Sequence, residues 1–202
     1  MRSRILLSGF LAVSVASSAI ADGDRFESPT AGFAFSKPST WVSASLQAAQ
    51  ENREKIRLND AQLEQQMKTQ ATPPLAVVMR HPEPYPDLNP SFQVGLRPLG
   101  ALEGKSASEI LGVILPTLEK AYADYRVVAP VSETTIGGLA ASRVGVEYTL
   151  KTDDGGSFPT RSDMVIIPRG KFMFFIGMGR KPGDSEADAD VASMLASIEI
   201  QP

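Results

Sequence analysis

The chain has 202 residues, 43% hydrophobic and 21% charged, which is the composition of an ordinary globular domain. Its net charge of −3 argues against nucleic acid or an anionic lipid surface as its partner. The absence of cysteine excludes disulfides, thiolate metal sites, cysteine nucleophiles and a lipid-modified cysteine.

The N-terminal stretch has the features of a secretory signal peptide. Arg2 and Arg4 precede an apolar run over residues 5–15, and residues 19–21 form an A-x-A cleavage site. The run is short and rich in Ser and Ala, which argues against a membrane anchor. We predict that residues 1–21 are removed, which leaves 18 basic against 23 acidic residues, a net charge of −5. The mature protein would be exported, as a periplasmic or secreted protein, with no later membrane-crossing segment.

The mature chain, residues 22–202, is predicted to be one domain that opens with short strands and a polar helix. Phe33 and Phe35 share one face of a predicted strand, and Trp41 is predicted to be a core anchor rather than a ligand-stacking residue. Residues 43–70 lack Gly and Pro and predict a helix with a thin apolar stripe and a candidate break at residues 59–60. Such a helix either docks lightly on the domain or contacts a partner.

A proline-rich loop over residues 81–90 separates predicted strands at residues 75–79 and 92–99. Four prolines in ten residues predict a stiff, polyproline-like segment without ladder hydrogen bonds. A stiff loop that carries an aromatic side chain can bind a partner at little ordering cost. The alternative is a rigid cover that keeps a sheet edge from aggregating. The candidate partner-binding residues are Pro82, Pro84, Tyr85 and Pro86.

The second half of the chain is predicted to supply the core. Ser106 and Glu109 form a capping box before a helix with a broad apolar face, which Pro116 should kink rather than end. Extended segments follow up to residue 136, and a final helix begins at residues 184–185 and leads to a last turn or a short strand. Between them, three antiparallel strands are predicted, and the last two are apolar on both faces and therefore central. These three strands cover residues 142–150, 164–167 and 172–176.

The order of these elements resembles the PsbP-like α/β/α sandwich. Residues 32–35, with Pro38 and Trp41, resemble the opening motif of that fold, and residues 194–198 resemble its terminal helix and tail. The resemblance implies an α+β fold, a largely antiparallel β-sheet flanked by helices, as in exported proteins of the PsbP/DcrB type. Members of the fold are mostly binding or assembly proteins, and no functional residue carries over to this chain.

No catalytic, cofactor-binding or metal-binding residue is predicted. The chain has a single histidine and neither a G-x-S-x-G nucleophile elbow nor a phosphate-binding glycine loop. His81, Glu83 and Asp87 could be drawn as a metal cluster, but solvated polar side chains are the favoured interpretation. Asp153 and Asp154 are interpreted as turn residues rather than calcium ligands.

One group of charges remains to be explained. Arg143 and Glu147 lie on one face of a predicted strand, and Arg161 and Asp163 are expected to face them across the ladder. We favour cross-strand ion pairs over a catalytic dyad.

These observations predict a non-enzymatic exported protein that binds or assists another protein of the cell envelope. The alternative is a small-molecule or lipid-binding module, with the ligand between the sheet and the helix at 43–70, whose thin stripe would leave sheet surface uncovered. A hydrolase with an unrecognised site is a third hypothesis, which no motif supports.

Overall fold

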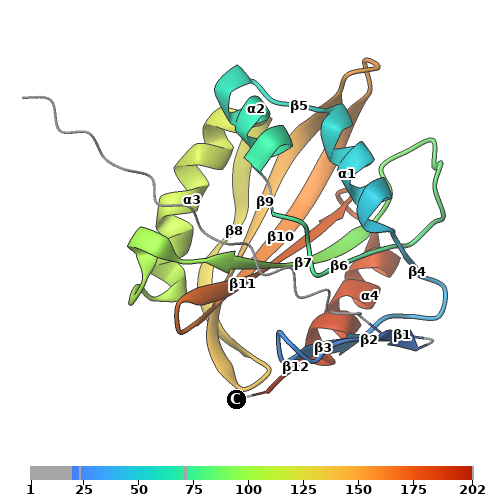
Figure 1. The fold of residues 1–202 in the computed structure, drawn as a ribbon. Helices are drawn as coiled ribbons and strands as arrows, with labels where there is room; N and C mark the ends of the chain where they lie inside the picture. The colour runs from blue at the N-terminus through green and yellow to red at the C-terminus, as the bar shows by residue number, and fades with distance from the viewer. Residues whose placement is uncertain (1–19, 23, 71, 202) are drawn as a thin grey trace, which may run out of the picture.

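The computed structural model describes residues 20–22, 24–70 and 72–201 (Figure 1). The predicted signal peptide lies outside these residues except for Ile20 and Ala21, and it stays a prediction. Ile20–Asp22 forms the short strand β1, so cleavage after Ala21 would remove most of that strand.

A main antiparallel sheet of eight strands forms the centre of the fold. The strand β9 pairs with β10 on one side, and on its other side with β8 and, at its far end, with β5. Across the sheet the strands are β4 (Val42–Ser43), β6 (Ala76–Met79), β7 (Ser91–Pro98), β11 (Phe172–Arg180), β10 (Ser157–Arg169), β9 (Leu139–Thr152), β8 (Ala123–Ile136) and β5 (Ile56–Arg57).

A second, four-stranded sheet has the order β1-β2-β3-β12 and lies at the bottom of Figure 1. The chain end returns to it, because β12 pairs with β3 and Glu199 accepts two hydrogen bonds from Arg25. A short terminal strand is therefore what forms, rather than a last helical turn. The new strands of this sheet are β2 (Arg25–Ser28), β3 (Phe33–Ser36) and β12 (Glu199–Ile200).

Both faces of β10 and β11 are covered, as their sequence predicts. Val165 and Ile167 belong to a core with the small sheet and α4 (Ser185–Ala196), whereas Met164 and Ile166 pack with α3 (Ala107–Ala121) on the other face. Trp41 is 1% exposed in the first core, and its Nε1–H donates to Asp190 at 2.7 Å, which confirms it as an anchor. The predicted α+β architecture, an antiparallel sheet flanked by helices, is therefore correct.

The predicted helix over residues 43–70 is two helices, α1 (Leu46–Lys55) and α2 (Ala61–Gln70). Between them Ile56–Arg57 forms β5, which pairs with the end of β9. The side chain of Asp60 then caps α2 by accepting from the backbone of residues 62 and 63. The helix is interrupted near the predicted position, but the cause is a strand pairing that the local sequence does not indicate.

Glu64 fixes the connection between the two helices. Its carboxylate accepts from Lys68, from the backbone N–H of Leu58 and from Arg57, and these bonds lower the pKa of Glu64 to about 2. The linker is also tied to the C-terminal end of α3, since the N–H of Asn59 donates to the carbonyl of Ala121. The helix pair thus has a defined position over the sheet even though it buries little.

The β10–β11 hairpin has Gly170 and Lys171 in its loop, with Gly170 at φ +59°. The strand β7 is an internal strand, and Pro98 is its last residue.

The capping box of α3 gives a direct test of the local stability rules. Ser106 accepts from the N–H of Glu109, whose carboxylate accepts from the N–H of Ser106, and Pro116 lies within the helix as predicted. We expect Ser106→Ala to lower the free energy of unfolding by about 1 kcal/mol, because orphan helix N–H groups lose their acceptor. Urea unfolding measures the change. Ser193→Ala, an exposed position in α4, is the matched control and should have almost no effect.

Candidate functional site

The loop that the sequence singles out is closed by its own hydrogen bonds. The N–H of Arg80 donates to the carbonyl of Pro90 at 2.9 Å. Asn89 accepts from the N–H of His81 at 3.1 Å and donates to its carbonyl at 2.8 Å and to Glu83 at 2.9 Å. The expectation of an extended polyproline-like segment is therefore wrong: the chain bends repeatedly, and one asparagine holds its two ends together.

Ion pairs tie the loop to the start of α4. Lys181 pairs with Asp87, and this contact lowers the pKa of Asp87 and raises that of Lys181. At the base of the loop, Arg80 pairs with Asp184 at 3.5 Å and with Glu186. These contacts join the loop to the rigid body of the fold.

The predicted partner-binding residues are presented outward by this closed loop. Pro82, Pro84 and Pro86 are exposed. Tyr85 is half-buried and stacks on His81, with ring centroids 4.3 Å apart and planes at 12°. The loop therefore offers three rigid apolar side chains at its surface.

The structure does not gather His81, Glu83 and Asp87 into a metal site. The imidazole of His81 stacks on Tyr85, the Glu83 carboxylate accepts from Asn89 and from the N–H of Tyr85, and Asp87 pairs with Lys181. Within residues 20–22, 24–70 and 72–201, no group of three His, Cys, Asp or Glu side chains is placed to hold a metal.

A second cluster surrounds Asp163, which is 1% exposed on the α4 side of the sheet. Its carboxylate contacts Arg180 at 2.7 Å, Arg161 at 3.2 Å and Arg143 at 3.3 Å. Burial alone would raise the pKa of Asp163, but the bonds from Arg161 and Arg180 and the charge of Arg143 outweigh it and lower that pKa.

The cluster extends across four strands. Arg161 lies opposite Glu147, 3.9 Å away, and Glu147 also pairs with Arg126 of β8. The predicted cross-strand pairing of Arg143, Glu147, Arg161 and Asp163 is thus confirmed. Sequence reasoning missed Arg180, which brings in Asp188 of α4. The sequence feature that could have indicated Arg180 is a charged residue at the end of a strand of otherwise apolar or small residues.

Gly145 makes room for this cluster. A Cβ at this position would lie 2.4 Å from Nη2 of Arg161 and 2.9 Å from Oδ1 of Asp163. The glycine lies opposite Asp163 in the β9–β10 ladder, so the guanidinium of Arg161 can cross the strand there. Missing side-chain volume, rather than backbone freedom, is the reason for glycine at this position.

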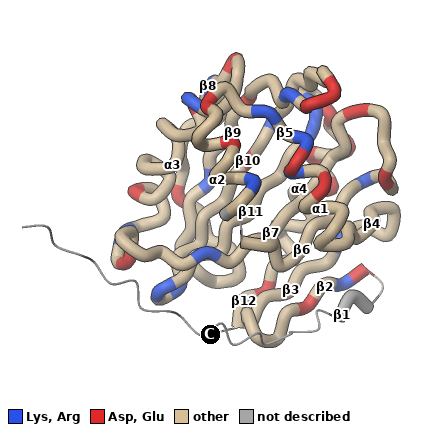
Figure 2. Tube along the Cα trace, turned by 45° about the horizontal axis from the view of Figure 1, so that its top comes forward, with Lys and Arg blue, Asp and Glu red and all other residues tan. Residues whose placement is uncertain are grey.

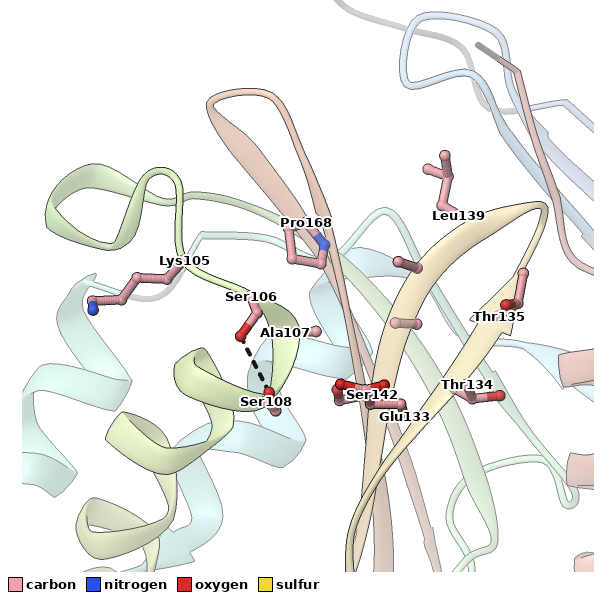
Figure 3. Close-up of a pocket in the computed structure, with 12 residues that line it drawn as sticks. Lys105, Ser106, Ala107, Ser108, Glu133, Thr134, Thr135, Leu139, Ser142 and Pro168 are labelled. Atoms are coloured by element: carbon pink, nitrogen blue, oxygen red, sulfur yellow. Dashed lines mark hydrogen bonds between the residues drawn. The ribbon is translucent and has the colours of Figure 1, made fainter.

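Two hollows flank the β8–β9 hairpin, one on each face. The larger, about 590 Å³, lies between the N-terminus of α3 and the two strands (Figure 3). Ser106 and Ser108 are hydrogen-bonded to each other at its rim, and Lys105 extends away from it and pairs with Glu109. The smaller, about 260 Å³, lies between the end of β8 and α4 and includes Arg143.

The residues that line these hollows supply hydroxyl groups and single charges, and they do not form an arrangement of catalytic side chains. In the larger one, the hydroxyl of Ser106 belongs to the capping box, and neither histidine nor cysteine lines it. Neither hollow lies beneath α1 or α2, where the sequence placed its alternative ligand pocket. The larger hollow has room for a ligand, and the carboxylate that contacts a lining hydroxyl there, Glu109 on Ser106 at 2.8 Å, is engaged in the capping box of α3.

Basic and acidic residues are interspersed along the described elements of the chain (Figure 2). Among the described residues, no helix is long and apolar enough to span a membrane.

Comparison with known proteins defines the fold class. No family model matches the sequence, and no relative appears among curated proteins. The structure is similar to that of cyanobacterial PsbP (CyanoP) from Synechocystis sp. PCC 6803, with a TM-score of 0.54, 10% identity, and coverage of 96% of this chain and 99% of that one. The chain therefore has a PsbP-like fold, and at this identity the likeness extends to the fold alone.

Two weaker likenesses accompany it. LpqN, involved in cell envelope biogenesis of Mycobacterium tuberculosis, is 15% identical, with a TM-score of 0.45 over 84% of this chain and 83% of that one. A protein of unknown function from Pseudomonas aeruginosa, PA94, is 15% identical, with a TM-score of 0.49 over 62% and 82%. Scores of this size add no argument about function.

The buried carboxylate generates a stability prediction. We expect Asp163→Asn to lower the free energy of unfolding by about 3 kcal/mol, because it leaves guanidinium groups without their shared counter-charge. Arg126→Gln is the control, since it breaks only an exposed pair and should cost less than about 1 kcal/mol. Both changes are measured by urea unfolding at neutral pH. Equal effects of the two variants would contradict a special role for the buried group.

The same carboxylate predicts a pH dependence. The pKa of Asp163 is lower in the folded state than its value of about 3.9 in an unfolded chain, so its charged form stabilises the fold above that value. This contribution is lost as the pH falls through the lowered folded pKa. The stability difference between the wild type and Asp163→Asn should therefore be constant from neutral pH to about pH 5 and shrink below about pH 4. A difference that persists undiminished at lower pH would show that the charge is not responsible.

Proposed function

We propose that the protein is an exported, non-catalytic binding protein that contacts another protein of the cell envelope through the loop of residues 81–90. The observation that carries this proposal is the fixed outward presentation of Pro82, Pro84 and Pro86 on a loop closed by Asn89. A surface ordered before binding loses little conformational entropy on contact. The N-terminal sequence features of a signal peptide support export.

The alternative role of the loop, to protect a sheet edge, explains less of its structure. The loop joins β6 to β7, and both of these strands are paired on two sides. Protection of an edge would need neither the stacked Tyr85 and His81 nor the ion pair between Asp87 and Lys181. Exposed apolar side chains on a tethered loop favour a contact surface.

A photo-cross-linking amino acid at position 85, in cells that export the protein, tests the proposal. We expect one dominant cross-linked envelope protein, and none when the same group replaces Val113, which is 53% exposed on α3. The same partner set from both positions, or no product from position 85, would contradict the proposed contact.

A matched pair of variants then separates contact from pre-organisation. Asn89→Ala leaves the exposed prolines in place but removes the bonds that close the loop, so affinity for the captured protein should fall about tenfold, a loss equivalent to about 1.4 kcal/mol. Gln66→Ala, on the exposed face of α2, should leave the affinity unchanged. Binding is measured by titration of the purified pair.

A further inference from the structure

A cross-strand pair of polar residues lines the larger hollow beside the β8–β9 hairpin. Ser142 of β9 lies opposite Glu133 of β8 in the ladder, and both belong to the lining of this hollow of about 590 Å³. Because side chains alternate along a strand, Ser142 shares a face with Val144 and Val146, which pack with α3. Figure 3 shows Ser142 and Glu133 across the hollow from Ser108, in the first turn of α3. The hollow is therefore bounded by two strands on one side and by the start of a helix on the other.

The hydroxyl of Ser142 is buried without a partner. Ser142 is only 2% exposed, yet its Oγ makes no hydrogen bond within the described part of the chain. The carboxylate of Glu133 likewise has neither a hydrogen bond nor an ion pair among the described residues. A buried hydroxyl normally has a hydrogen-bond partner, because the loss of hydration otherwise costs free energy. The pair thus presents a free hydroxyl and a free carboxylate to an occupant of the hollow.

The opposite wall supplies backbone donors. The capping box of α3 uses the N–H groups of Ser106 and Glu109. Those of Ala107 and Ser108, which also line the hollow, have no acceptor among the described residues. The carboxylate of Glu109 at this turn is paired with Lys105. Since the positive end of the helix dipole lies here as well, this wall favours an anionic group.

We propose that this hollow binds a small zwitterion, a free amino acid or a short peptide. The carboxylate of the ligand is held by the N–H groups of Ala107 and Ser108, as anions are at helix N-termini. Its ammonium group is held on the other wall by the carboxylate of Glu133 and the hydroxyl of Ser142, through charge-assisted hydrogen bonds. The volume lies within the range of small-molecule sites, about 300–1,000 Å³.

The rest of the lining favours a zwitterion with an aliphatic side chain over other ligands. Ala140 and Pro168 add small apolar surfaces to the hollow. A sugar would use the hydroxyl groups but would leave Glu133 without a cation. A divalent metal ion would need further acidic ligands, and the described residues contain no group of three that is placed to hold one.

Titration calorimetry of the purified protein with L-leucine and with L-alanyl-L-leucine tests the proposal. We expect saturable binding, and the tighter of the two ligands distinguishes a free amino acid from a peptide. The N-acetyl derivative of that ligand lacks the ammonium group and its amide lacks the carboxylate, so each should bind at least about tenfold more weakly. Saturable binding of glucose without binding of either zwitterion would overturn the proposal.

Matched variants test the assigned contacts. Ser142→Ala and Glu133→Gln should each lower the affinity for the zwitterion about tenfold. The controls are Ser193→Ala on α4 and Glu119→Gln near the other end of α3, both at exposed positions, and they should bind as the wild type does. Because Glu133 contacts the ammonium group, Glu133→Gln should not weaken binding of the N-acetyl derivative. Equal losses for the zwitterion and for this derivative would overturn the assignment.

The melting temperature separates binding from a structural role. The Ser142 hydroxyl has no partner in the protein, so Ser142→Ala should leave the melting temperature of the unliganded protein unchanged or raise it. A lower melting temperature with unchanged affinity would overturn the proposal. So would the absence of saturable binding of both zwitterions to the wild type. None of residues 81–90 lines the hollow, so these outcomes do not depend on the protein partner of the loop.

Discussion

Burial of both faces of β10 and β11 is the constraint on which the rest of the structure depends. A strand with apolar residues on both sides is stable in water only between two layers, so other elements of the chain must pack on each face of the sheet. The small sheet, α4 and Trp41 cover the apolar part of one face, and α3 packs on the other.

The charged cluster at Asp163 marks the boundary of the apolar core on the α4 side of the sheet. Towards the far ends of β9, β10 and β11, apolar side chains give way to charged ones, and the buried carboxylate is tolerated because three guanidinium groups surround it. Gly145 supplies the space that this packing needs. The arrangement is internally satisfied: each acid has a basic partner and Arg180 links the sheet to α4, so it serves the fold rather than a ligand.

Secondary structure could be predicted from the sequence wherever it depends on residues within the same element. Alternation in β9, the two-faced apolar runs of β10 and β11, and the capping box at Ser106 all depend on neighbours in the chain, and all formed as predicted. The interruption at Ile56 did not, because it arises from pairing with Thr152, almost a hundred residues away. Arg180 was missed for the same reason, as its partners belong to β10 and α4.

The prediction of the conformation of the proline-rich loop failed for a different reason. Proline fixes φ at its own position, which is why the sequence predicts a stiff loop. The path of the loop, however, is set by the amide of Asn89 and by salt bridges to the β11–α4 connection, and single-sequence patterns do not encode such contacts. The candidate residues themselves are exposed or half-exposed as a contact surface requires.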